Sequence, residues 1–149
     1  MSSESREWNA DARGLKFAIV VARFHREITE KLLEGAREGL SKAGADGVAV
    51  FYVPGAFELP LAAQRLAKTA LYHAIVALGA VIRGETPHFD YIAGEAARGL
   101  QQVALDTGVP VAFGVLTTDT YDQAAARAGG PHGNKGLDAA MTAIEMARL

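Results

Sequence analysis

A polar stretch, GETPH at positions 84–88, directly follows the apolar run AIVALGAVI. It combines an acid at Glu85, a hydroxyl at Thr86 and an imidazole at His88. An unperturbed histidine has a pKa of about 6.5, which suits proton transfer at neutral pH. Backbone N–H groups and a threonine hydroxyl at a helix start can also hold a small phosphate. The stretch therefore predicts a phosphate site beside a proton-transferring histidine, although a histidine taken alone is more often an ordinary surface residue.

The glycines of GAVIRG, Gly79 and Gly84, have the spacing of the phosphate-binding loop found in nucleoside triphosphatases. That loop needs a lysine directly after its second glycine, where this sequence has Glu85. The substitution excludes a nucleotide hydrolase of this type and leaves a Gly-Glu-Thr turn able to bind a smaller phosphate.

Three more polar loops follow apolar runs in the same way. They are RFHRE at 23–27, PGAFE at 54–58 and TTDT at 117–120. Because ligands bind outside the carboxyl ends of strands in open parallel sheets, we expect these loops to converge with residues 83–89 on one rim. The rim predicts a binding site for a small molecule.

Each residue in these loops also has a purely structural interpretation. Phe24 can pack against a helix, and Glu58 can favour a helix N-terminus through the helix dipole. Thr118 or Asp119 can cap the helix that follows. Only the convergence of the loops at one rim favours a functional interpretation of these residues over a structural one.

Two cations, Arg127 and Lys135, lie near the end of the chain, and most such residues are solvated surface charges. The four histidines are far apart and show no metal-ligand spacing, so no metal site is predicted. They are His25, His73, His88 and His132.

Hydrophobic patterning indicates which elements position the loops. Near-continuous apolar runs, typical of buried parallel strands, cover 16–22, 48–53, 74–82 and the residues after Val109. Apolar residues spaced along one face predict helices over 27–44, 56–69, 90–108, 120–129 and 137–149, with a glycine-rich loop before the last. The alternation predicts an α/β fold, specifically a flavodoxin-like three-layer sandwich with a central four-stranded parallel sheet.

The chain has 149 residues, half of them hydrophobic, which is enough for one domain with its own core. We expect a flexible N-terminal arm over 1–14, in which Trp8 is the one residue suited to burial, and a domain over 15–149. The absence of cysteine excludes disulfides, thiolate catalysis and cysteine zinc sites.

The 15 basic and 17 acidic residues are intermixed, which argues against a nucleic-acid partner. No apolar run reaches the roughly 18 residues of a membrane span. The polar start of the chain resembles neither a signal nor a transit peptide. These features predict a cytoplasmic protein.

Four motifs occur in order: VPGAFELP, ALGAVIRGETPHFDY, GVLTTDT and RAGGPHGNKGLDAA. Together they resemble the lumazine synthase family over 15–149. The resemblance implies an enzyme, a transferase, that condenses 5-amino-6-(D-ribitylamino)uracil with 3,4-dihydroxy-2-butanone 4-phosphate. The product is 6,7-dimethyl-8-ribityllumazine, formed with release of phosphate in the penultimate step of riboflavin biosynthesis. The resemblance implies no cofactor and no metal.

The resemblance also implies roles for residues near the strand ends. Phe24 matches the aromatic that stacks on the pyrimidine, and His88 matches the proton shuttle. The other matches are Ala56, Phe57 and Glu58 for the ribityl chain, backbone groups of Ala80, Val81 and Ile82 for the pyrimidine edge, and Gly84, Glu85 and Thr86 for the phosphate.

The same resemblance implies that a neighbouring subunit completes the site. Arg127 matches the phosphate-binding arginine, contributed in trans together with Phe113 and Lys135, and Asp138 falls where the family often has an acid near that lysine. The implied assembly is a homopentamer. The short GGPHGNKG loop favours the 60-subunit icosahedral shell that some members form. Riboflavin synthase is a candidate partner of that shell.

Three alternatives remain. A non-enzymatic flavin- or lumazine-binding protein could share the fold, but it needs no phosphate site of the kind that His88, Arg127 and Lys135 suggest. A flavodoxin-like electron carrier needs a Ser/Thr-rich loop after the first strand, which RFHREIT hardly provides. A purely structural shell protein differs from the enzyme only in lacking activity.

Overall fold

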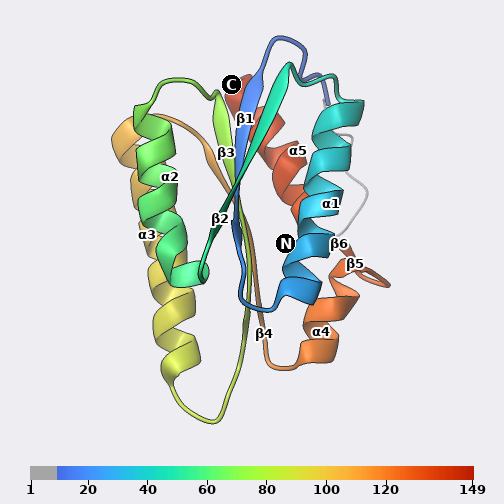
Figure 1. Cartoon of the computed structure of the whole chain (residues 1–149), viewed down its shortest axis with the longest axis vertical. Helices are drawn as coiled ribbons and strands as arrows, with labels where there is room; N and C mark the ends of the chain where they lie inside the picture. The colour runs from blue at the N-terminus through green and yellow to red at the C-terminus, as the bar shows by residue number, and fades with distance from the viewer. Residues whose placement is uncertain (1–9) are drawn as a thin grey trace.

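Figure 1 shows the computed structural model, which describes residues 10–149, as a sheet between two layers of helices. The sheet is parallel, with the strand order β2-β1-β3-β4. Its strands are β1 (Lys16–Ala22), β2 (Gly47–Val53), β3 (Ala74–Ile82) and β4 (Val111–Thr118). This arrangement confirms the expected flavodoxin-like sandwich with a four-stranded parallel sheet.

The helices divide between the two faces of the sheet (Figure 1). One face carries α1 (Arg26–Lys42) and α5 (Lys135–Ala147), and the other carries α2 (Leu59–Lys68) and α3 (His88–Thr107). A single 3₁₀ turn, η1 (Ala56–Glu58), precedes α2. The short helix α4 (Tyr121–Ala126) and the hairpin of β5 (Ala128–Gly130) and β6 (Gly133–Asn134) lie on the same side of the sheet as α1.

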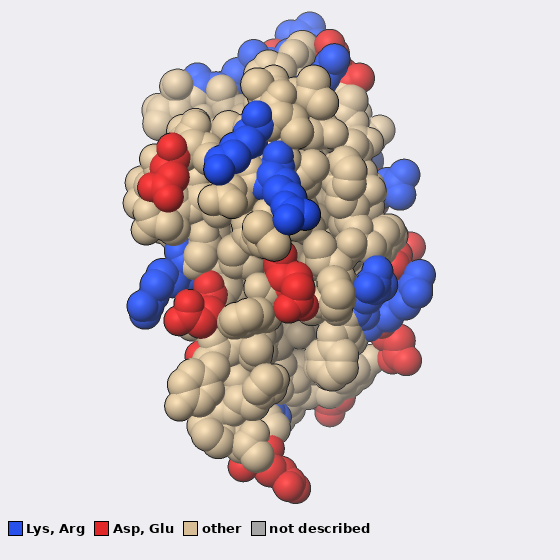
Figure 2. Space-filling model, turned by 60° about the vertical axis from the view of Figure 1, so that its left-hand side comes forward, with Lys and Arg blue, Asp and Glu red and all other residues tan. Residues whose placement is uncertain are grey.

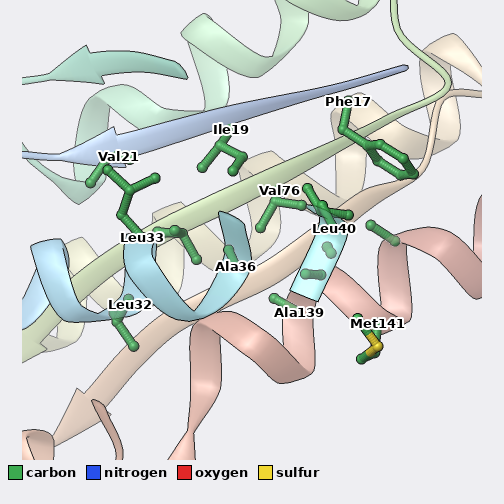
Figure 3. Packing of buried hydrophobic residues seen from close by; sticks show 14 of the residues in the cluster. Phe17, Ile19, Val21, Leu32, Leu33, Ala36, Leu40, Val76, Ala139 and Met141 are labelled. Carbon is green, nitrogen blue, oxygen red and sulfur yellow. The ribbon is translucent and has the colours of Figure 1, made fainter. Parts of the chain in front are cut away.

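The central strand β1 is buried on both faces from Phe17 onward. Because side chains of a strand alternate between faces, Phe17, Ile19 and Val21 pack against α1 and α5, as Figure 3 shows. The intervening residues pack against α2 and α3. Burying each large side chain stabilises the fold by about 1.5–3 kcal/mol. Because a strand covered on both faces gains this energy at every position, its sequence is a continuous apolar run, and that run predicted β1 correctly.

Helices α1 and α5 approach each other closely at Gly136, the second residue of α5. A side chain at this position would overlap the backbone carbonyl of Leu32 in α1. Asn134 caps α5, since its Oδ1 accepts from the N–H groups of Gly136 at 2.8 Å and Leu137 at 3.1 Å. Its Nδ2 donates to the Lys31 carbonyl of α1 at 3.0 Å. Asn134 therefore fixes where α5 begins.

Two expectations about the last third of the chain were wrong. The N-cap of α4 is Thr120 rather than Thr118 or Asp119, because Thr120 and Gln123 form a reciprocal capping box. The glycine-rich segment expected as a loop forms the β5–β6 hairpin, and α5 begins at Lys135 instead of 137. Strands this short and glycine-rich carry no hydrophobic pattern that could reveal them.

Helix α3 also begins earlier than expected, at His88 instead of 90. Pro87 occupies the N-cap position, where a residue without an N–H group is tolerated. The earlier start brings His88 into the first turn of the helix.

Residues 1–9 of the expected N-terminal arm, Trp8 among them, lie outside the described residues. Within residues 10–14, Ala12 is fully buried and its N–H donates to the Ala43 carbonyl at 2.9 Å. From the end of α5, Arg148 donates to the carbonyls of Asp11 at 3.0 Å and Arg13 at 2.6 Å. This segment therefore packs on the domain that follows it.

Figure 2 views the molecule with the α2–α3 side turned forward and shows Lys and Arg interspersed with Asp and Glu. The face presents no continuous basic stripe of the kind that nucleic-acid binding requires. Among residues 10–149, no helix combines the length and the hydrophobicity needed to cross a membrane.

Candidate functional site

The carboxyl ends of β2, β1 and β3 open into a cavity of about 880 Å³, here called the strand-end cavity. It lies where the loops leave the sheet at the lower end of Figure 1. Three of the four expected loops contribute to its lining, together with the end of β3 and the first turns of α3. The lining residues are Phe24, His25, Pro54, Gly55, Ala56, Phe57, Glu58, Ala80, Val81, Ile82, Gly84, Thr86, His88, Phe89, Tyr91 and Ile92.

The fourth loop, residues 117–120, does not line the strand-end cavity. In the described part of the chain, strand β4 is at the edge of the sheet and pairs only with β3, so its end lies beyond the cavity. Asp119, for which we expected a capping role, instead accepts from Arg83 Nε at 2.8 Å. The fourth loop therefore meets residues 83–89 at the same edge of the sheet, as expected, but it does not line the cavity.

The end of β3 forms a buried part of the cavity wall. Ala80 and Val81 are almost fully buried, and β3 pairs with β4 up to Ile82, whereas its pairing with β1 ends at Leu78. Ala56, at the start of η1, is also buried, whereas Phe57 and Glu58 are exposed. The cavity thus has a rigid apolar base and a polar rim.

Phe24 presents an open aromatic face at the rim. Its side chain is 67% exposed, while its N–H donates to the Pro54 carbonyl at 3.1 Å. The ring meets the His25 ring edge-on, with centroids 4.5 Å apart. Such a ring, held by its backbone and uncovered on one side, can stack on a flat heterocycle.

His25 is a cavity residue that the sequence reasoning missed. It adopts the left-handed conformation, with φ of 59°, at the start of α1. Partial burial lowers the pKa of its imidazole, which favours the neutral form. Its place beside Phe24 was the only signal for it.

Tyr91 and Ile92 were also missed, although helical spacing could have found them. They follow His88 by three and four residues, so they share its face of α3. All three line the cavity, and Tyr91 is 69% exposed. The first turns of α3 thus contribute more lining residues to the cavity than the loop at residues 83–87 does.

The turn at Gly84, Glu85 and Thr86 has free hydrogen-bond donors. Within the described part of the chain, the backbone N–H groups of these residues donate to no protein acceptor. The turn precedes the N-terminus of a 20-residue helix, whose dipole favours an anion. Gly84 and Thr86 line the cavity, and Glu85 does not.

His88 is the first residue of α3, is exposed, and lines the same cavity. Its N–H lies 3.4 Å from Thr86 Oγ1, a contact that ties the helix start to the turn. The structure therefore brings the imidazole and the free N–H groups of the turn together, as expected from GETPH.

A second cavity, of about 810 Å³, lies along β4 and α5 and is here called the edge-strand cavity. Four of the predicted site residues line it: Phe113, Arg127, Lys135 and Asp138. They share it with His132, which sequence reasoning did not select. Of the residues that the structure describes, none lines both cavities.

The cations of the edge-strand cavity are held by short-range contacts. Arg127 ends α4, and its Nη1 donates to the Gln123 carbonyl at 2.9 Å. The N–H of Lys135 donates to the Arg127 carbonyl at 2.9 Å, which joins the two residues across the hairpin. Asp138 lies one turn further along α5.

The charges of the two cavities differ accordingly. The lining of the strand-end cavity, all of it within residues 10–149, contains Glu58 and no Lys or Arg. The lining of the edge-strand cavity contains the two cations Arg127 and Lys135 and one acid, Asp138. A phosphate bound at the turn would therefore have hydrogen-bond donors but no cation from its own subunit's cavity lining.

Comparison with known proteins gives the same assignment. The family model described as 6,7-dimethyl-8-ribityllumazine synthase matches residues 14–149. A protein of Syntrophus aciditrophicus (strain SB) with that name is 56% identical over 140 residues, which cover 93% of this chain and 91% of the relative. The chain therefore belongs to the 6,7-dimethyl-8-ribityllumazine synthase family.

Proposed function

We propose that this chain condenses 5-amino-6-(D-ribitylamino)uracil with 3,4-dihydroxy-2-butanone 4-phosphate and so forms 6,7-dimethyl-8-ribityllumazine. Family membership supports the reaction, a transferase step of riboflavin biosynthesis. The observation that carries the residue assignments is the separation of donors and cations between two cavities.

The pyrimidine substrate binds in the strand-end cavity. Phe24 stacks on its ring, and backbone groups of Ala80, Val81 and Ile82 pair with its polar edge. The ribityl chain extends along η1, where Glu58 accepts from its hydroxyls beside Ala56 and Phe57. The exposed ring of Phe24 and the exposed carboxylate of Glu58 at one rim support this pose.

The phosphate of the second substrate binds at Gly84, Glu85 and Thr86. The free N–H groups of this turn and the dipole of α3 supply the donors. Glu85 contributes its backbone, because its side chain lies outside the cavity lining. A phosphate held here places the rest of the small substrate against the base of the cavity.

His88 carries protons during the condensation. The primary amine of the pyrimidine attacks the ketone, and loss of water gives an imine; a proton then leaves carbon as phosphate departs, and the enol so formed becomes a carbonyl. The ribityl-bearing amine attacks that carbonyl, and loss of a second water closes the ring. Most of the rate comes from holding both reactants in register. An imidazole at the cavity wall can accept and return the protons, which contributes about 10²–10⁴-fold in comparable cases.

A neighbouring copy of the chain supplies the missing positive charge. Its Arg127 pairs with the phosphate, with Lys135, Phe113 and Asp138 beside it. Within residues 10–149, the strand-end cavity has no Lys or Arg in its lining, and no strand pairs with the outer edge of β4, beside which these residues line the edge-strand cavity. Both observations support this proposal. The assembly we propose is a homopentamer that builds a 60-subunit icosahedral shell in the cytoplasm, with riboflavin synthase as a candidate partner.

The test is absorbance-monitored lumazine formation by the wild type against a blank without enzyme. We expect His88→Ala to lower kcat about a hundredfold and Arg127→Ala mainly to raise KM for the butanone phosphate. Mixed oligomers of the two variants should regain part of the activity, because some interfaces then pair an intact His88 with an intact Arg127.

Two outcomes would contradict this proposal at different levels. Mixed oligomers without regained activity would refute the shared site but leave the reaction standing. A wild type that merely matches the blank while binding the ribityl-pyrimidine would refute the reaction and favour a binding protein.

A further inference from the structure

Arg83, the residue between β3 and the phosphate turn, contacts three side chains. Its Nε donates to Asp119 Oδ1 at 2.8 Å, and its Nη2 lies 3.7 Å from Asp90 Oδ1. The guanidinium carbon lies 4.5 Å from the centroid of the Phe89 ring. Asp90 and Phe89 belong to the first turn of α3, directly after His88.

The backbone reinforces this connection. The N–H of Arg83 donates to the Thr118 carbonyl at the end of β4 at 2.9 Å. Asp119 is itself fixed, because its N–H donates to Gln123 Oε1 at 2.9 Å in the first turn of α4. Arg83 therefore links a well-held part of the fold to the start of α3.

The turn between these anchors has few contacts of its own. Gly84 has open space where a side chain would project, and residues 84–88 are exposed. The β3–α3 connection also extends beyond the other strand-end loops in Figure 1. A segment with so few contacts opens readily unless its ends are anchored.

We propose that Arg83 and Asp119 form a positioning pair that holds the phosphate turn and His88 in register with the strand-end cavity. The proposal rests on the function proposed above. Arg83 is absent from the residues that line the cavity, so it acts through Phe89 and Asp90 rather than on substrate.

The geometry suits arginine better than lysine. A planar guanidinium can lie over an aromatic ring while its N–H groups donate to carboxylates within the guanidinium plane, which a lysine ammonium cannot do. The side chains of Arg83 and Asp119 are 48% and 68% exposed. Exposed pairs add little to stability, so the effect should appear in kinetics, since misplacement by about 1 Å can cost a hundredfold in rate.

The experiment compares Arg83→Met, Arg83→Lys and Asp119→Asn with the wild type by steady-state kinetics for both substrates. We expect Arg83→Met to lower kcat about tenfold and to raise KM for the butanone phosphate, with KM for the pyrimidine unchanged. Arg83→Lys should recover part of this loss. Adding Asp119→Asn to Arg83→Met should change little further, because both act through one contact.

The matched control is Lys42→Met, which breaks another exposed pair, with Glu38 at 2.7 Å, in the last turn of α1. Its kinetics and melting temperature should equal those of the wild type. Wild-type kinetics in Arg83→Met, or equal rises in both KM values, would overturn the proposal. If Arg83→Met does not fold, Arg83→Lys and Asp119→Asn carry the same test.

Amide hydrogen exchange separates this inference from the proposed reaction. In Arg83→Met, residues 88–92 should exchange faster than in the wild type, and residues 74–82 should not. Unchanged exchange in residues 88–92 would overturn the positioning role. A wild type without turnover would instead refute the reaction, and exchange would still decide the role of Arg83.

Discussion

The strand-end and edge-strand cavities are similar in volume, about 880 and 810 Å³, but only the lining of the second, among residues 10–149, contains Lys or Arg. The first offers an aromatic face, free N–H donors and an imidazole, and the second offers Arg127 and Lys135. A phosphate is bound more tightly when a cation pairs with it in addition to hydrogen-bond donors, and this attraction is larger in a site with little water. The difference indicates that each subunit carries two incomplete halves of the proposed active site. In the assembly we propose, the strand-end cavity of one copy meets the edge-strand cavity of another.

The halves are also built differently. Buried parallel strands and the start of a 20-residue helix support the strand-end cavity. A capped short helix, a small hairpin and the close contact of α1 with α5 support the cations of the other. A substitution in the elements that support one cavity should therefore leave the other cavity intact.

The largest effect is expected for Gly136→Val, which pushes a side chain into the Leu32 carbonyl. Overpacking of this kind costs about 3 kcal/mol when the obstacle is backbone, measured as the free energy of unfolding. Because Lys135 adjoins the site, KM for the butanone phosphate should rise, whereas the pyrimidine should still bind. Gly94→Ala in open space on α3 is the control and should stabilise by about 1 kcal/mol.

Phe24→Ala should weaken the strand-end half alone. The side chain is 67% exposed, so stability should hardly change. Loss of stacking worth about 1–1.5 kcal/mol should raise KM for the pyrimidine about tenfold, with KM for the butanone phosphate unchanged. Phe24→Tyr should restore binding; equal KM values for Phe24→Ala and the wild type would refute the stacking role.

Asn134→Ala should cost about 1–2 kcal/mol of unfolding free energy, because α5 loses its cap and α1 a hydrogen bond. Asn134→Asp retains the acceptor but lacks the amide donor to Lys31. Urea denaturation of both variants separates the two contributions. An Asn134→Asp protein as unstable as Asn134→Ala would show that the cap contributes nothing.

The smallest effect concerns the pH dependence of stability near Phe24. The pKa of His25 is lower in the folded protein than its ordinary value of about 6.5. Between these two pKa values the unfolded chain binds more protons, so the contribution of His25 to stability decreases as pH falls through this window. His25→Asn, which also tolerates the left-handed conformation, should flatten the dependence. Urea midpoints at several pH values from about 7 to 5 measure it, and an unchanged slope would contradict the assignment.

The sequence predicted most where burial was continuous. Strands β1 and β3 have the predicted bounds because every residue of their interior is apolar. The hairpin and the true cap of α4 were missed, since both depend on backbone geometry and a side-chain pair rather than on hydrophobic spacing.

The site was predictable in part. GETPH pointed to a phosphate and a proton-transferring group from residue chemistry alone, and the structure brings that imidazole and the turn together. The roles of Arg127, Lys135 and Asp138 came only from family resemblance, because nothing in local sequence indicates which copy of the chain they serve. The contact of Arg83 with Asp119 was not predictable, since it joins loops 36 residues apart.

Arg148 donates hydrogen bonds to the carbonyls of Asp11 and Arg13, and these bonds hold the end of α5 beside the segment that leads into β1. A short linker could therefore join Leu149 to Ala10 without disturbing the sheet. New ends would best lie at Thr69–Leu71, an exposed connection between α2 and β3 at the opposite end of the strands from the strand-end cavity. The fold is thus suited to circular permutation, which would change where the chain begins while keeping both half-sites.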